Sequence, residues 1–297
     1  MPAIRILRAG PLTTLQDAGR PGWQRFGISA SGPMDRGAFD RAASWLGGAG
    51  ATGIEFTSAG LKFEIEGGPL GAAFDGGTFK LTIDGKEQPW PTRAVLRDGS
   101  IVDISPGAKG NYGYVRFDRE VDVPMVLGSR ATNSIAGLGG LEGRALVAGD
   151  VIAFGASVPG RPGPHPHPAE VVEGPIRINW GIHADLFEAE RRQRFTSKPF
   201  RISQQLDRMG VRLKDETGVF ADARILSLAS DAIVPGDIQI LGDGTPIVLM
   251  RDHQPTGGYP RIATVITADL DRFAQLPPGA ELRFAAVTVA HAQGVRP

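Results

Sequence analysis

The sequence predicts a mainly β protein with a few short helices, organised as two β-barrel domains. Its 297 residues include 41 glycines and 23 prolines, and turn residues spaced so closely leave little room for long helices. Apolar and polar residues alternate along several short segments, which is the period of a half-buried strand. A proline-rich stretch near the middle of the chain separates two parts of ordinary domain size.

Several short segments carry the strand pattern. The clearest of them are residues 61–66, 79–83, 238–241, 246–250 and 282–287. Asp84-Gly85 follows the second of these segments and is a hairpin turn signal. Strands joined by such short turns are expected to pair in an antiparallel arrangement.

Only three segments have helical spacing of apolar residues. The first is 34–46, for which either Ser31 or Asp35 is suited as the N-terminal cap. The second is 183–195, which has an acidic residue early and arginines late, as the helix dipole favours. The third is the short segment 270–276.

The segment 157–168 is the clearest place for a domain boundary. Five prolines and two glycines among its twelve residues exclude a helix or a central strand. We therefore predict an N-terminal barrel at 1–156, a linker at 157–168 and a C-terminal barrel at 169–297.

Composition excludes several classes of function. Lys plus Arg and Asp plus Glu both number 32, so the chain lacks the basic excess of a nucleic-acid or anionic-membrane binder. There is no cysteine, which removes disulfides and thiolate sites, and no metal site is expected. No apolar run is long enough for a signal peptide or a membrane span, so a cytoplasmic protein is expected.

Nucleotide and biotin signatures are also missing. The glycines of 48–53 match GxGxxG, but they follow a predicted helix instead of a strand, so a plain loop is favoured. There is no P-loop, so ATP, if it is used, must bind by other means. There is no Met-Lys biotinylation signature, so this chain does not carry biotin itself.

Three polar, glycine-punctuated segments are candidates for chemistry: 12–35, 126–132 and 251–260. Their glycines permit close approach of the backbone to a small ligand, and their Gln, Asp, Arg and Tyr side chains offer hydrogen bonds and charge. The alternative is that these are tight turns whose charges form structural ion pairs. Composition alone favours that alternative.

These segments closely resemble the biotin-dependent carboxyltransferase-like family, whose members are also called allophanate hydrolase subunit 2, Kip antagonist protein or the C subunit of 5-oxoprolinase. The resemblance begins with TTLQDAGRPG at 13–22 and SGPMD at 31–35. It continues with EFT at 55–57, VPMVLGSR at 123–130, GGLEGRAL at 139–146, DRMGVRL at 207–213, VPGDIQ at 234–239 and TGGYPRIAT at 256–264. The motifs occur in order over nearly the whole chain.

The resemblance implies two cyclophilin-like β-barrel domains and a heteromeric complex. The implied partners are a Kip inhibitor-like protein, which is the B subunit of 5-oxoprolinase, and the A subunit; the set hydrolyses 5-oxoproline to glutamate. ATP, with Mg, would bind at or with the partner subunit. One alternative is a carboxyltransferase that uses biotin carried on another chain, as in urea carboxylase. Another is a non-catalytic regulator that binds the Kip inhibitor-like protein.

Opening a lactam after phosphorylation requires proton transfer, hydrogen-bond donors and cations. The candidates for catalysis are Asp17, Arg20, Asp35 and Asp207. The candidates for substrate binding are Gln16, Arg130, Arg208, Gln254 and Tyr259. The candidates for backbone approach are Gly19, Gly32, Gly128, Gly257 and Gly258. We expect the N-terminal motif and the 254–260 loop to meet in one cleft.

The sequence departs from the family pattern at three places: 116–119, Gln204-Gln205 and Pro255. The charges of the first departure would narrow or recharge a pocket. The departures bear on the choice of substrate and leave the predicted fold unchanged.

Overall fold

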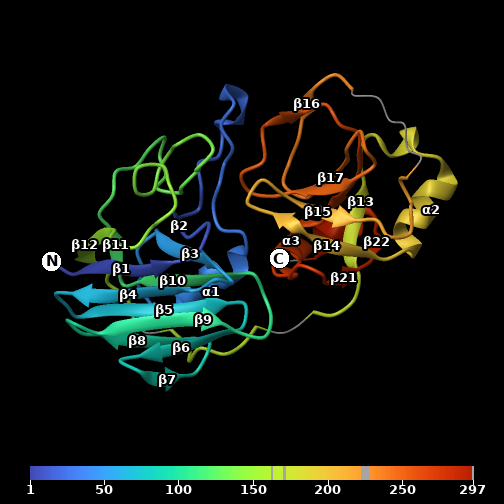
Figure 1. Cartoon of the computed structure of the whole chain (residues 1–297). Coiled ribbons are helices and arrows are strands. Elements are labelled where there is room, and N and C mark those ends of the chain that lie inside the picture. The colour runs from blue at the N-terminus through green and yellow to red at the C-terminus, as the bar shows by residue number, and fades with distance from the viewer. Residues whose placement is uncertain (162, 170–171, 222–227, 296–297) are drawn as a thin grey trace. The chain divides into compact units, whose positions relative to one another are not determined.

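The computed structural model describes residues 1–161, 163–169, 172–221 and 228–295 (Figure 1). The chain divides into two compact units. Unit 1 comprises Met1–Pro21 with Ser31–Glu170, and unit 2 comprises Gly22–Ala30 with Val171–Pro297. Both units are built mainly from strands, which confirms the predicted fold class.

Unit 1 consists of two antiparallel sheets. The seven-stranded sheet has the order β11 (Arg119–Val121), β12 (Val151–Ser157), β1 (Ala3–Ala9), β4 (Leu61–Glu66), β9 (Ile101–Pro106), β6 (Phe79–Ile83) and β7 (Lys86–Gln88). The five-stranded sheet has the order β2 (Thr14–Gln16), β3 (Gly53–Thr57), β10 (Tyr112–Phe117), β5 (Leu70–Gly76) and β8 (Thr92–Leu96). Figure 1 labels the strands of both sheets, which overlap in this view.

The core of unit 1 contains apolar side chains from both sheets. Phe117 of β10 lies between Phe63 of β4 and Phe154 of β12, with ring centroids 6.4 and 4.7 Å away. The alternation predicted for 61–66 is seen as strict alternation of buried and half-buried residues in β4. Burial of such aromatic rings is the main source of stability for a fold of this type.

One helix covers the five-stranded sheet of unit 1. Helix α1 (Arg36–Leu46) begins after Asp35, whose side chain accepts a hydrogen bond from Ala38 N, so Asp35 and not Ser31 is the cap. Its buried face includes Ala42 and Trp45, which pack on Ala73 of β5. Of the segment 48–53 that follows, residues 48–52 form a loop and Gly53 begins β3, so the plain loop that the sequence favoured is found.

Unit 2 contains a nearly closed barrel. Its sheet has the order β21 (Glu281–Leu282), β14 (Phe200–Leu206), β15 (Gly210–Lys214), β18 (Pro246–Leu249), β17 (Asp237–Ile240), β20 (Arg261–Val265), β13 (Ile176–Trp180) and β22 (Phe284–Ala286). The two edge strands, β21 and β22, are separated by one residue in the sequence, so the two edges of the sheet come together. A separate pair is formed by β16 (Asp231–Ala232) and β19 (Thr256–Gly257).

Short helices complete unit 2. They are η1 (Gln24–Phe26), η2 (Ala184–Leu186), α2 (Ala189–Ser197), α3 (Thr267–Ala274) and α4 (Val289–Gly294). The single helix predicted at 183–195 is wrong in one respect, because Phe187 and Glu188 are extended and separate η2 from α2. Phe187 is buried against the ring of Phe220, and this packing interrupts the helix. No helix within the described ranges is long and apolar enough to cross a membrane.

The predicted linker has contacts with unit 1. The backbone at Gly160 and Gly163 runs so close to the end of α1 that a Cβ atom at either position would overlap a carbonyl oxygen, of Gly47 or Ser44 respectively. Arg93 donates a hydrogen bond to Gly163 O. Pro162 of this segment lies outside the described residues, and the boundaries 1–156, 157–168 and 169–297 stay a prediction.

Candidate functional site

Asp17 lies at the centre of a hydrogen-bonded network in unit 1. Its Oδ1 accepts from Gly19 N at 2.8 Å and from Ser129 Oγ at 2.6 Å, and its Oδ2 accepts from Arg130 N at 2.6 Å. The side chain is buried. This one carboxylate therefore holds the first motif to the 126–132 segment, although more than 100 residues separate them in the sequence.

Gln16 and Arg20 complete this network. Gln16 donates to Thr132 O and accepts from Gly32 N. Arg20 donates to Ala131 O and to Ser31 Oγ. Both side chains are buried. The structure thus brings together Gln16, Asp17, Gly19, Arg20, Gly32 and Arg130 of the predicted site.

Backbone conformation explains three of the predicted glycines. Gly19, Gly32 and Gly128 have φ values of 87°, 95° and 80°, a region that side-chain-bearing residues adopt only at a cost. Arg130 is held by a bond from its Nε to Val123 O at 2.7 Å and by an ion pair with Glu120 at 3.5 Å. These loops have a defined shape that their own residues maintain.

Asp35 belongs to a second buried network, which sequence reasoning missed. Its backbone N donates to the Tyr114 hydroxyl at 2.7 Å, and that hydroxyl donates to Glu55 at 2.9 Å. Met34 N also donates to Glu55. Burial raises the pKa of Tyr114 well above its usual value, and the charge of Glu55 adds to this shift. Glu55 is a charged residue at a buried position of β3, and this feature of the strand is the signal that could have identified it.

In unit 2, the predicted residues Asp207 and Arg208 have different structural roles. Asp207 Oδ1 accepts from Met209 N and Gly210 N, which shapes the turn between β14 and β15. Arg208 forms a two-bond ion pair with Asp252, with Nε–Oδ2 and Nη2–Oδ1 distances of 2.7 and 3.2 Å. The side chains of this pair are only 4% and 2% exposed. Asp252 was not predicted as a site residue.

The loop at 253–259 presents a different environment. Gln254 is exposed, and the Tyr259 ring is 40% exposed with no hydrogen bond of its hydroxyl among the described residues. His253 is buried and donates from Nδ1 to Gln254 O at 2.6 Å. Burial lowers the pKa of this imidazole.

Close packing explains the remaining two glycines of this loop. A Cβ atom at Gly257 would lie 2.6 Å from Gln239 Nε2, and one at Gly258 would lie 2.8 Å from Leu228 O. The loop and the N-terminal motif belong mostly to different units. The shared cleft predicted for them therefore stays a prediction.

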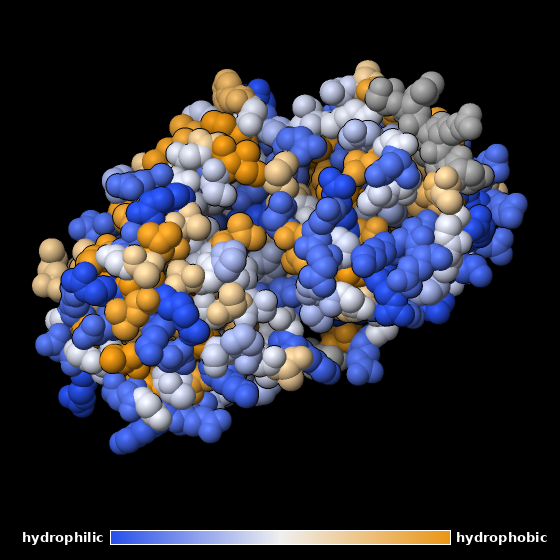
Figure 2. Space-filling model, viewed as in Figure 1, coloured by the Kyte–Doolittle hydropathy of each residue, from blue (hydrophilic) through white to orange (hydrophobic). Residues whose placement is uncertain are grey.

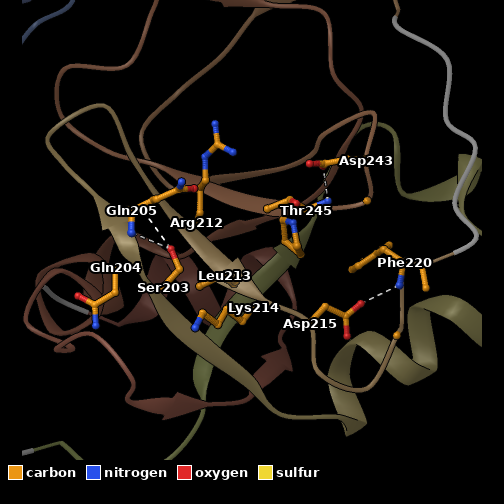
Figure 3. A pocket seen from close by; sticks show the side chains of 14 residues that line it. Ser203, Gln204, Gln205, Arg212, Leu213, Lys214, Asp215, Phe220, Asp243 and Thr245 are labelled. Atoms are coloured by element: carbon orange, nitrogen blue, oxygen red, sulfur yellow. Dashed lines mark hydrogen bonds between the residues drawn. The ribbon is translucent and has the colours of Figure 1, made fainter.

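Two of the pockets lined by described residues lie away from the predicted site residues. The larger, of about 590 Å³, lies in unit 2 beside β14 and β15 (Figure 3). Its walls include Gln204 and Gln205, the one departure from the family pattern that lines it. The other, of about 320 Å³, lies in unit 1 and is lined by Trp45, Arg93 and Asp118, among others.

Arg116, the first of the divergent residues, is a structural brace. It donates to Phe39 O and Gly50 O and lies over the Phe39 ring at 3.7 Å. Burial lowers its pKa to about 10, which leaves it charged at neutral pH. It thus joins α1 to the loop before β3, whereas Asp118, which belongs to the same departure, lines the pocket of unit 1.

The described residues contain no dense cluster of metal ligands. Among them, no group of three or more His, Asp or Glu side chains gathers where it could hold a metal ion. Magnesium bound with a nucleotide usually needs at least one or two carboxylates near the phosphates. We therefore derive no step in which this chain itself holds Mg-ATP.

Comparisons with known proteins agree on one family. The carboxyltransferase domain model, subdomain A and B, matches residues 26–286. The chain is 34% identical to the C subunit of 5-oxoprolinase from Escherichia coli, over 95% of this chain and 90% of that protein. It is 31% identical to the urea amidolyase of Saccharomyces cerevisiae, over 95% of this chain but only 16% of that protein.

A solved structure gives the same result for the fold. The urea carboxylase of Kluyveromyces lactis superimposes with a TM-score of 0.87 at 26% identity, over 98% of this chain and 28% of that one. The predicted family resemblance is thereby confirmed. The chain belongs to the family of carboxyltransferase domains with subdomains A and B, which includes the C subunits of 5-oxoprolinases and the corresponding parts of urea amidolyases.

Proposed function

We propose that this chain is the C-type subunit of an ATP-dependent 5-oxoprolinase, which opens 5-oxo-L-proline to L-glutamate. The observation that carries the proposal is the extent of the match. Similarity to the C subunit of 5-oxoprolinase covers 90% of that protein, whereas similarity to the urea amidolyase of Saccharomyces cerevisiae covers 16% of a far longer protein. In this proposal the chain acts with an A subunit, together with a Kip inhibitor-like B subunit.

The chemistry of the substrate requires several functional groups, and in this proposal more than one subunit supplies them. An unstrained lactam resists water, so its carbonyl oxygen first accepts the γ-phosphoryl group of ATP and ADP departs. Water then adds to the activated carbon, the ring C–N bond breaks, and a second water releases phosphate from the resulting acyl phosphate. Donors near the carbonyl and a proton acceptor near the water lower these barriers.

The residues of this chain divide into two roles in the proposal. Asp17, Arg20 and Gln16 are bonded to protein groups, so we assign them the positioning of the loops around the substrate. Tyr259 and Gln254 have exposed side chains, so we assign them contact with the substrate. ATP with its magnesium is assigned to the partner side of the complex, as the family resemblance implies.

The second candidate is a carboxyltransferase that receives a carboxyl group from biotin on another chain. It is favoured by the family model and by the likeness to urea carboxylase. Streptavidin detection of proteins that copurify with this chain distinguishes the two. A biotinylated carrier in stoichiometric amount favours carboxyl transfer, and its absence together with lactam turnover favours 5-oxoprolinase.

The direct test is reconstitution with the A and B subunits. We expect the assembled set to release ADP and glutamate from 5-oxoproline, and the isolated chain to release neither. Turnover by the purified chain alone would contradict the proposed division of labour. Failure of the complete set on 5-oxoproline, with the complex shown to be assembled, would remove the proposed substrate.

Tyr259→Phe tests the site within that assay. The hydroxyl group makes no hydrogen bond among the described residues, so its loss should leave folding intact. We expect turnover to fall at least 100-fold, which corresponds to about 2.7 kcal/mol of transition-state stabilisation. The control is urea denaturation of the purified Tyr259→Phe chain, which should match that of the original chain and so separates a lost substrate contact from a lost fold.

A further inference from the structure

The pocket of unit 2 is shaped by an irregularity in one strand. Ile202 pairs with Leu213 and Leu206 pairs with Val211, so three residues, 203–205, oppose Arg212 alone. Ser203 Oγ accepts from Gln205 N at 3.0 Å and holds this bulge closed (Figure 3). Bulges of this kind redirect side chains and are frequent beside binding sites.

Two amide side chains emerge from the bulge. Gln204 and Gln205 are both exposed and both line the pocket. Neither side chain has a hydrogen bond among the described residues. The primary amides of this wall are thus free to donate to and accept from a bound molecule.

Two cations of the neighbouring strand face the same pocket. Arg212 and Lys214 are two positions apart on β15, so they project from one face of the sheet with their Cα atoms about 7 Å apart. Both line the pocket, and neither forms an ion pair within the part of the chain that the structure describes. Hydrophilic residues cover much of unit 2 in Figure 2.

The two carboxylates of the pocket are already bonded. Asp215 accepts from Phe220 N at 2.8 Å, and Asp243 accepts from Thr245 N at 2.9 Å. Those bonds from Thr245 hold the pKa of Asp243 below its usual value, and the nearby charge of Arg212 contributes. The carboxylates therefore stabilise the turns, whereas the two cations have hydrogen-bond donors that no described residue accepts.

We propose that this pocket binds a small organic monoanion through its carboxylate. The guanidinium of Arg212 is suited to two parallel bonds with a carboxylate, Lys214 supplies a second cation, and the bulge amides hold a polar group on the rest of the ligand. A volume of about 590 Å³ lies within the range of small-molecule sites.

The charge of the wall selects among anions. Two cations and two carboxylates balance among the described residues that line the pocket, so a dianion finds less compensation there than a monoanion. A nucleotide or phosphate ester would meet repulsion from Asp215 and Asp243 that a single carboxylate can avoid by position. The inference goes beyond the proposed function, since none of the residues assigned to that function lines this pocket.

Calorimetric titration of the full chain, without ATP or partner proteins, tests the inference. The probes are L-glutamate and 5-oxoproline, which are monoanions at neutral pH, with 2-pyrrolidinone as the lactam lacking a carboxylate and inorganic phosphate as the competing anion. We expect at least one carboxylate to saturate one site and to bind at least tenfold more tightly than 2-pyrrolidinone or phosphate. Absence of carboxylate binding, or tighter binding of phosphate, would overturn the proposal.

Arg212→Gln locates the binding. We expect it to weaken carboxylate binding at least tenfold, about 1.4 kcal/mol, while Arg192→Gln on α2 of the same unit changes nothing. Equal weakening by both variants would show a general charge effect and refute the site. Lys214→Gln, at an exposed position, supplies the same test if Arg212→Gln does not fold.

These measurements are separate from the test of the proposed function. Carboxylate binding that depends on Arg212 would stand even if the reconstituted complex failed on 5-oxoproline. Conversely, binding that is unaffected by both pocket variants would refute this site and leave the turnover assay of the complex untouched.

Discussion

The polar residues around Asp17 in unit 1 and those around Arg212 in unit 2 occupy opposite environments. Asp17, Gln16 and Arg20 are buried, and protein groups satisfy them. Arg212 and Lys214 line an open pocket, with no ion pair among the described residues. The first set resembles the interior of a fold, although its sequence is that of a loop.

The difference bears on how a candidate site is recognised. A buried and saturated polar group costs stability when it is removed, because its former partners are left unpaired. An exposed cation without a partner contributes little to stability and keeps its donors for a ligand. Substitutions therefore separate residues that shape a site from residues that bind, when stability and binding are measured together.

The largest expected effect on stability comes from the ion pair of Arg208 and Asp252. Asp252→Asn leaves the guanidinium of Arg208 buried beside a neutral group, and we expect the free energy of unfolding to fall by about 3–5 kcal/mol. Urea denaturation measures this change. Asp185→Asn is the matched control, because Asp185 pairs with Arg192 but has a side chain that is 95% exposed.

We expect that control to change stability by less than about 0.5 kcal/mol. Equal effects of the two substitutions would mean that burial does not distinguish the two ion pairs. The comparison between the buried and the exposed polar groups of this molecule would then fail.

The next effect is expected at Asp17. Asn has one acceptor oxygen in place of two, so its NH₂ group must face a donor such as Arg130 N, and about 1.5–3 kcal/mol of stability should be lost. Asp122→Asn in the same region replaces an exposed carboxylate and should be neutral. Because the loops around Asp17 lose their shape in Asp17→Asn, turnover of the complex should also fall in that variant. Turnover should be unchanged in Asp122→Asn.

Much of the fold could be predicted from local pattern. The strand at 79–83 and the alternation at 61–66 depend on neighbours in the sequence, and the structure confirms them. Asp35 was one of two caps that the sequence offered for α1, and the structure selects it. The break between η2 and α2 could not be predicted, since it depends on Phe187 packing against Phe220, a contact between distant residues.

The site was predictable to a smaller extent. Glycines and charged residues identified the loops, but not which side chains are saturated, because the partners of Asp17 lie more than 100 residues away. The pocket beside β15 could not be predicted, because Arg212 and Lys214 look like the outer face of an ordinary strand. The bulge at 203–205, which depends on pairing register, and loops distant in the sequence line the cavity there.

A pH-dependent effect is expected from His253. Its folded-state pKa is lowered by burial, so below the ordinary value of about 6.5 the unfolded chain binds the proton more readily than the folded one. Stability from this group is thus full at neutral pH and declines as the pH falls below about 6.5. His253→Gln should flatten the profile of unfolding free energy between about pH 7 and 5.5.

His291→Gln, at an exposed position of α4, is the control for that profile and should leave its slope unchanged. A slope that persists in His253→Gln would assign the acid sensitivity to other groups. His253 would then not belong with the buried polar residues that stabilise the fold.

The smallest effect on stability is expected at the pocket cations. Arg212→Gln and Lys214→Gln remove no ion pair within the described residues, and the two positions flank each other on one face of β15, where like charges repel. We expect each substitution to change the free energy of unfolding by less than about 0.5 kcal/mol in urea denaturation. A loss of stability above about 1 kcal/mol would show that protein groups bind these cations, as Asp252 binds Arg208. The contrast between the hydrogen-bonded network of unit 1 and the open pocket of unit 2 would then disappear. Unchanged stability combined with weakened carboxylate binding would have one explanation. A cation whose loss weakens binding but not folding has its partner in the bound carboxylate and not in the protein.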